Sequence, residues 1–199
     1  IIRRFMIAKC DYKKGKITED ALERSELLMK EVGAAEEDRA VVIPAREYAE
    51  YKRNCDKKYV NVVVMAIEMP DGTIVTGRSS RRMVAAGAAV LNAVKKLAGI
   101  PDDLYLIAPN VFKSIQELKG GVLHHDRTSL NVEEILTALS ISAESNSCAD
   151  KAVKILEQLN GCKAHCTAIL SERDEQTLRA MGIDVTCDPE YLTTNLYFA

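Results

Sequence analysis

The strongest hydrophobic pattern in the chain is a nearly unbroken apolar run at residues 60–69. Such a run predicts a strand that is covered on both faces, because a half-exposed strand alternates apolar and polar residues. The turn Pro70-Asp71-Gly72 follows, and residues 73–77 are again rich in β-branched side chains. An Asp-Gly pair between two such runs is typical of a hairpin, so we expect two antiparallel strands here.

The segment after the hairpin predicts a buried helix. Between residues 83 and 94 only Gly87 and Asn92 interrupt a run of Met, Val, Ala and Leu. A helix over 81–98 is therefore apolar almost all round and needs cover on more than one side. The apolar run at 104–108 predicts a third strand. A helix that connects two strands favours a parallel, right-handed arrangement, so we expect this strand to run parallel to the second.

Helical or strand spacing continues on both sides of this unit. The patterns predict helices over 1–12, 18–33, 44–56, 109–119, 132–143, 148–159 and 172–181, and strands over 163–170 and 183–187. Asn131 and Glu134 have the spacing of a capping box. The expected fold class is α/β, with a mixed sheet flanked by helices. Its outline, a hairpin followed by parallel strands, resembles the cytidine-deaminase-like architecture.

We divide the chain into a helical N-terminal segment at residues 1–43 and an α/β domain at residues 44–199, with a helical insertion at about 120–160. The chain starts with Ile-Ile-Arg-Arg inside an amphipathic helical pattern and has no initial methionine. We therefore interpret the N-terminal segment as the continuation of a missing N-terminal half.

Composition narrows the class of protein. The 199 residues are 47% hydrophobic and 28% charged, which suits one globular core. A net charge of -2 argues against a general nucleic-acid or membrane-surface binder, since both need a positive field over much of the surface. No apolar run is long enough to span a bilayer, and the six cysteines indicate free thiols, so we expect a cytoplasmic protein.

Four phrases are specific enough to indicate a family. They are the segments at residues 67–77, 91–100, 138–143 and 161–165, which read IEMPDGTIVTG, LNAVKKLAGI, ALSISA and GCKAH. They resemble the C-terminal part of the bacterial and archaeal family catalogued as domain of unknown function 1846. The resemblance implies a longer protein whose N-terminal half looks nucleotide-binding. Because the family has no established activity, the resemblance implies no catalytic residues in this chain.

The deaminase-like outline invites a test for a zinc site. Zinc deaminases hold the metal with a His or Cys that precedes a Glu by two residues at the start of one crossover helix, and with two Cys at the start of the next. Residues 78–99 contain no His, Cys, Asp or Glu, and residues 109–119 contain no Cys. The sequence therefore excludes the zinc deaminase reaction, and we predict no metal site.

A positive signal lies at the start of the same helix. Ser79 and Ser80 are suited to cap it, and Arg78, Arg81 and Arg82 place three positive charges at a helix end that is already electropositive. A phosphate or carboxylate ligand would compensate these charges through backbone N–H groups, serine hydroxyls and arginine forks. The alternative is pairing with acidic side chains of the missing half or of another subunit.

Two other groups are weaker candidates. A glycine-led loop carries His124, His125, Asp126 and Arg127. Functional residues often gather in loops, although loop histidines are commonly just solvated. The run Cys162-x-x-His165-Cys166 suggests a metal or redox centre, but strand alternation puts the two cysteines on one face and the histidine on the other. That arrangement favours buried structural thiols.

Two function hypotheses follow. In the first, the chain is the C-terminal α/β portion of a larger cytoplasmic enzyme and supplies anion contacts for a phosphorylated or nucleotide-like ligand. In the second, it is a non-catalytic structural module that forms a homo-oligomer through the apolar helix at 83–94. The sequence assigns no cofactor, reaction or catalytic residue to either hypothesis.

Overall fold

The computed structural model describes residues 1–191, and a four-stranded sheet lies at its centre. The strands are β1 (Val64–Glu68), β2 (Ile74–Arg78), β3 (Lys163–Cys166) and β4 (Asp184–Cys187), in the spatial order β2-β1-β3-β4. β1 pairs antiparallel with both β2 and β3, and β3 pairs parallel with β4. β2, β3 and β4 therefore point the same way, and β1 points the opposite way.

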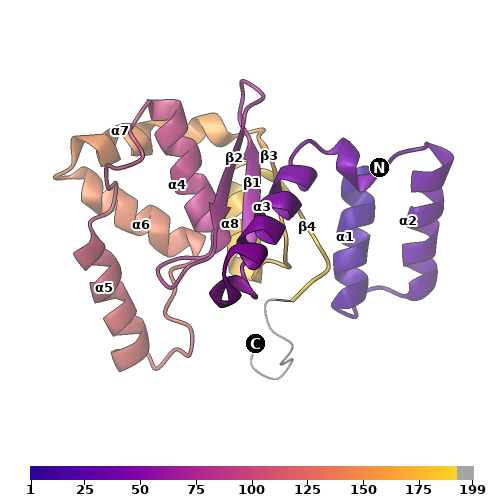
Figure 1. The fold of residues 1–199 in the computed structure, drawn as a ribbon, viewed down its shortest axis with the longest axis horizontal. Coiled ribbons are helices and arrows are strands. Elements are labelled where there is room, and N and C mark those ends of the chain that lie inside the picture. Colours follow the sequence, from indigo (N-terminus) through magenta and orange to yellow (C-terminus); the bar gives the residue numbers. More distant parts are fainter. Residues whose placement is uncertain (192–199) are drawn as a thin grey trace.

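Helices cover both faces of the sheet, which confirms the α/β class and the mixed sheet (Figure 1). They are α1 (Ile2–Lys13), α2 (Glu19–Glu31), α3 (Val42–Cys55), α4 (Ala85–Ala98), α5 (Pro109–Glu117), α6 (Val132–Ala143), α7 (Ser147–Ile155) and α8 (Glu172–Ala180). In Figure 1 the α1–α2 pair lies at one end of the molecule and α4 to α7 lie at the other, with the strands between them. The predicted capping box of α6, from Asn131 and Glu134, is present.

The central strand β1 is covered on both faces, as its apolar run predicts. Val64 and Ala66 pack on one face against buried residues of α3. Met65 and Ile67 belong to the larger hydrophobic core on the other face, together with residues of α4, α6 and α7. Strand alternation explains the division, because successive side chains point to opposite faces. Each face carries apolar residues, so burial on both sides is favourable.

Small residues let α4 approach the sheet very closely. A Cβ atom on Gly77 of β2 would lie 2.1 Å from the backbone nitrogen of Ala89, and one on Gly87 would lie 2.0 Å from Cδ1 of Ile135 in α6. α4 is thus held between the sheet and α6, and eight of its residues are buried. The prediction that this helix needs cover on more than one side is confirmed, and its own chain provides the cover.

The prediction of a third strand over 104–108 is wrong. This segment has no regular secondary structure. Leu106 and Ile107 are buried in the core that contains α4, and the side-chain amide of Asn146 donates to the carbonyl oxygens of Tyr105 and Leu106 at 2.9 and 3.3 Å. An apolar run does not specify the surface against which it packs. Here the run packs in the core that contains α4 and forms no strand.

A chain of charged side chains joins the N-terminal helices to the sheet. Arg46 of α3 contacts both Asp188, which follows β4, and Glu36, while Lys9 of α1 pairs with Glu36 at 2.5 Å. His165 of β3 lies beside Asp188. These contacts link both sides of the division that we predict at residue 43, and the division itself remains a prediction.

Within residues 1–191, no helix is both long enough and apolar enough to cross a membrane.

Candidate anion-binding site

The predicted arginine and serine residues lie in a tight loop between β2 and α4. Ser79 extends the hairpin: its backbone N–H donates to the carbonyl of Val63 at 2.8 Å, and its hydroxyl accepts from the N–H of Val63 at 3.0 Å. The hydroxyl of Ser80 accepts from the N–H groups of Arg82 and Met83 at 3.2 and 3.3 Å. Both serines are therefore engaged in the backbone of the loop.

The expected start of the helix is wrong by four residues. α4 begins at Ala85 and Val84 occupies its N-cap position, so neither Ser79 nor Ser80 caps the helix. Arg81 and Arg82 lie four and three residues before Ala85, and because the helix dipole acts mainly within the first turn, its effect on them is weakened. The case for a ligand consequently depends on the cavity beside the loop and not on the helix end.

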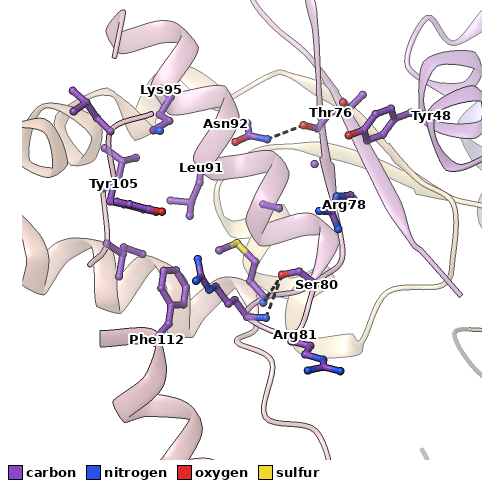
Figure 2. A pocket seen from close by; sticks show the side chains of 17 residues that line it. Tyr48, Thr76, Arg78, Ser80, Arg81, Leu91, Asn92, Lys95, Tyr105 and Phe112 are labelled. Atoms are coloured by element: carbon purple, nitrogen blue, oxygen red, sulfur yellow. Dashed lines mark hydrogen bonds between the residues drawn. The ribbon is translucent and has the colours of Figure 1, made fainter. Parts of the chain in front are cut away.

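That cavity, which we call the arginine cleft, has a volume of about 570 Å³. Its walls come from the end of β2, the following loop, α4, the 104–107 segment and single residues of α3 and α5 (Figure 2). The lining residues are Tyr48, Thr76, Gly77, Arg78, Ser80, Arg81, Arg82, Met83, Ala88, Leu91, Asn92, Lys95, Leu104, Tyr105, Leu106, Ile107 and Phe112.

The charge of the arginine cleft is of one sign. Arg78, Arg81, Arg82 and Lys95 line it, and no aspartate or glutamate does. In the part of the chain that the structure describes, none of these four side chains forms an ion pair. Positive groups that share a hollow without an acid raise the local potential, so an anion that enters is stabilised by all of them.

Arg78 is held in place by an aromatic ring. Its guanidinium lies 4.9 Å from the centroid of Tyr59, in a cation–π arrangement. This contact restrains the guanidinium and leaves its N–H donors free, because the guanidinium of Arg78 hydrogen-bonds to no residue among 1–191. An arginine that is positioned but has free donors is well suited to bind a phosphate or carboxylate.

The opposite wall of the cleft is apolar. Figure 2 shows Tyr105 and Leu91 close together on one side, with Phe112 nearby and Lys95 farther along α4, while Arg78 and Arg81 come from the other side. Clefts with a largely apolar lining and a few polar groups are typical of sites for small organic ligands.

Sequence reasoning missed the part that α4 contributes. Ala88, Leu91, Asn92 and Lys95 line the cleft, and their spacing places them on one face of the helix. The amide of Asn92 donates to the carbonyl oxygen of Thr76 at 2.9 Å, at the outer edge of β2. Asn92, which interrupts the apolar run, and Lys95 three residues later could have indicated that this face of the helix is not buried in the core. Nothing in the local sequence indicated the aromatic residues of the opposite wall.

The loop candidates do not join the cleft. His124, His125, Asp126 and Arg127 are all exposed, and none of them lines it. After this loop, Leu130 lies beside the arginine segment, and its N–H donates to the carbonyl of Arg82 at 2.9 Å. An active-site role for these four residues stays a prediction.

The cysteine and histidine run is divided as strand alternation predicts. Cys162 and Cys166 are buried in the main core, while His165 points to the other face, where its Nδ1 atom lies 3.1 Å from the hydroxyl of Thr186. Burial raises the pKa of both thiols, that of Cys166 to about 12. The six cysteines of the chain are all free thiols. Residues 1–191 contain no group of three or more His, Cys, Asp or Glu side chains that could hold a metal ion.

Comparison with known proteins gives a family for the chain. Residues 37–197 match the family described as "Domain of unknown function DUF1846, C-terminal". The chain is 48% identical over 198 residues to a UPF0371 protein of Clostridium botulinum strain Langeland, and 49% identical over 199 residues to a UPF0371 protein of strain Alaska E43. Both alignments cover 100% of this chain but only 39% of the relative's length. The chain therefore belongs to the DUF1846 family, and its residues 37–197 correspond to the C-terminal domain of that family.

Proposed function

We propose that this chain supplies the anion contacts of a ligand site in a larger protein. The observation that carries the proposal is the arginine cleft, a cavity of about 570 Å³ that is lined by three arginines and one lysine and by no carboxylate. The ligand is a phosphorylated or nucleotide-like molecule. Its anionic part lies against the arginines and its apolar or aromatic part lies against Tyr105, Leu91 and Phe112.

The chemistry of the complete protein lies outside the cleft in this proposal. The lining residues include no Asp, Glu, His or Cys, so the cleft offers binding groups but no side chain that is a usual general base at neutral pH. The chain spans 39% of the length of the curated relatives, and the remaining part of such a protein is the partner that would complete the site. We place the protein in the cytoplasm, in keeping with its free thiols.

We also propose that the sheet is a variant of the cytidine-deaminase-like architecture. Supporting this, the chain forms a hairpin first, and β2, β3 and β4 share one direction. The proposal concerns the outline of the fold only, and superposition on a solved deaminase would test it.

Calorimetric titration of the 199-residue chain would test the anion site. The ligands are phosphate, adenosine 5′-monophosphate and adenosine. We expect the monophosphate to bind more tightly than either of its parts. The triple variant Arg78→Ala, Arg81→Ala, Arg82→Ala should lose at least about 100-fold in affinity. That loss corresponds to about 2.7 kcal/mol, and one or two charge-assisted hydrogen bonds at about 1.5–3 kcal/mol each already account for it.

The matched control is Lys96→Ala, which removes an exposed charge from α4 outside the cleft. Its affinity should stay within about twofold of the unchanged chain, because exposed charges at a distance are screened by salt. Equal affinities for the triple variant and the unchanged chain would refute the proposal. Equal affinities are also what the alternative predicts, in which the arginines pair with acidic side chains of the remaining protein and bind no ligand.

The self-association hypothesis loses its original motive. Its apolar helix, α4, is covered by the sheet and by α6, and four of its less buried residues, Ala88, Leu91, Asn92 and Lys95, line the arginine cleft. A homo-oligomer remains a prediction, which sedimentation velocity of the chain would test directly.

A further inference from the structure

A second hollow adjoins the arginine cleft. Its volume is about 430 Å³. The residues that line it are Lys58, Tyr59, Asn61, Val62, Arg78, Ser79, Ser80 and Arg81. Arg78, Ser80 and Arg81 line both cavities, so both spaces border the loop after β2. We call this second space the Lys58 hollow.

The two spaces differ in the residues that line them. The arginine cleft combines basic residues with a broad apolar wall, whereas the Lys58 hollow is lined by three cations, an amide, two serines and one tyrosine, with Val62 as its single aliphatic residue. No carboxylate lines the Lys58 hollow. Three cations line this small space and no acid does, so it suits a small anionic group.

Arg78 stands between the two spaces. Tyr59 holds its guanidinium from one side at 4.9 Å, and the donors of the guanidinium lie in the plane of the group. Those donors point outward in several directions in that plane, so one guanidinium can serve two neighbouring anionic groups, one in each space. Lys58 is the residue that distinguishes the hollow, and its ammonium now pairs with Asp56 at 2.8 Å.

We infer that the ligand carries two linked anionic groups, with Arg78 at their junction. The first group lies in the arginine cleft beside the apolar body of the ligand, and the second reaches the Lys58 hollow. The chemical class is an aromatic or nucleoside diphosphate. This inference rests on the proposed function of the arginine cleft and specifies its ligand.

The test compares adenosine 5′-diphosphate with adenosine 5′-monophosphate in calorimetric titrations of the 199-residue chain. The unchanged chain should bind the diphosphate at least about tenfold more tightly, because the second group gains charge-assisted contacts. Asp56→Asn removes the carboxylate that now pairs with Lys58. This variant should raise the preference for the diphosphate about threefold and leave the monophosphate affinity unchanged.

The variant Asp56→Asn, Lys58→Ala removes one charge of each sign, so the net charge of the chain is unchanged. It should lower the preference for the diphosphate about fivefold, again with the monophosphate unaffected. Lys57→Ala is the matched control, since Lys57 is an exposed neighbour that does not line the hollow. Circular dichroism and the retained monophosphate affinity show that each variant is folded.

The outcomes separate the two proposals. If the monophosphate binds in an arginine-dependent way but the diphosphate binds no more tightly, this inference is overturned and the anion site stands. A preference for the diphosphate that the Lys58 variant leaves intact also overturns it. If neither nucleotide binds, both proposals fail.

Discussion

Asp188 makes a strong pH-dependent contribution to the stability of the fold. Its carboxylate accepts hydrogen bonds from Nε of Arg46, at 3.2 Å to each oxygen, and from the terminal nitrogen of the same guanidinium at 2.6 Å. Nε2 of His165 lies 3.4 Å from one of its oxygens. Burial alone would raise the pKa of Asp188, but the neighbouring His165 and Arg46 outweigh burial and lower the pKa from 3.8 to about 2.

The shift sets the size and the sign of the effect. A pKa that falls from 3.8 to about 2 on folding corresponds to about 2 kcal/mol of stability at neutral pH. Since the folded-state pKa is the lower one, the unfolded chain binds a proton first as the pH falls. The contribution is therefore complete above about pH 5, about half lost at pH 3 and lost below the folded-state pKa.

Urea unfolding of the unchanged chain and of Asp188→Asn, followed by circular dichroism between pH 7 and pH 3, measures this contribution. We expect the variant to be less stable by about 3 kcal/mol at pH 7, because Arg46 then lacks its main partner. The difference should shrink by about 1 kcal/mol at pH 3, where the native aspartate has already lost part of its advantage.

Asp150→Asn is the matched control. Asp150 pairs with Lys154 one turn along α7 on the surface, so its replacement should change stability by less than about 0.5 kcal/mol at every pH. A stability difference between the unchanged chain and Asp188→Asn that stays constant from pH 7 to pH 3 would refute the reasoning.

Two further predictions concern packing and thiol reactivity. Gly77→Ala should lower the free energy of unfolding by about 3 kcal/mol, because the new Cβ would meet the rigid backbone of Ala89. Gly121 has open space around it, so the control Gly121→Ala should change the free energy of unfolding by less than about 1 kcal/mol. Equal urea midpoints for the two variants would contradict this prediction. Iodoacetamide at pH 8 should label the exposed Cys55 in the folded chain, while buried Cys166, with its pKa raised to about 12, should react only on unfolding. Peptide mass spectrometry reads both sites, and rapid labelling of Cys166 without unfolding would count against its burial.

The elements that the sequence predicts correctly have local causes. The hairpin follows from an apolar run, an Asp-Gly turn and a second β-rich run. The start of α6 follows from the spacing of Asn131 and Glu134, which form reciprocal hydrogen bonds over three residues. The apolar circumference of α4 correctly indicates burial on more than one side. In each case the residues that decide the structure are neighbours in the chain.

The sequence predictions fail where segments far apart in the chain determine the local structure. The helix was expected to begin near Arg81, but residues 80–83 form a turn and Leu130 bonds to the backbone on either side of Met83, so α4 starts only at Ala85. In the 104–108 segment, Leu106 and Ile107 are buried in the core that contains α4, and the side-chain amide of Asn146 donates to the carbonyl of Tyr105. Hydrophobicity requires that these side chains be buried but does not specify which surface buries them.

The candidate site also combines features that the local sequence predicts with features that only the packing of distant segments creates. Its arginines and serines are adjacent in the chain, so their charge pattern is visible without coordinates. Lys95, Tyr105 and the cavity itself become part of the site only when α4 and the 104–107 segment fold back beside β2. Local hydrogen bonds and periodic patterns are properties of neighbouring residues, whereas a cavity is a gap between surfaces that lie far apart in the chain, and only their packing creates it.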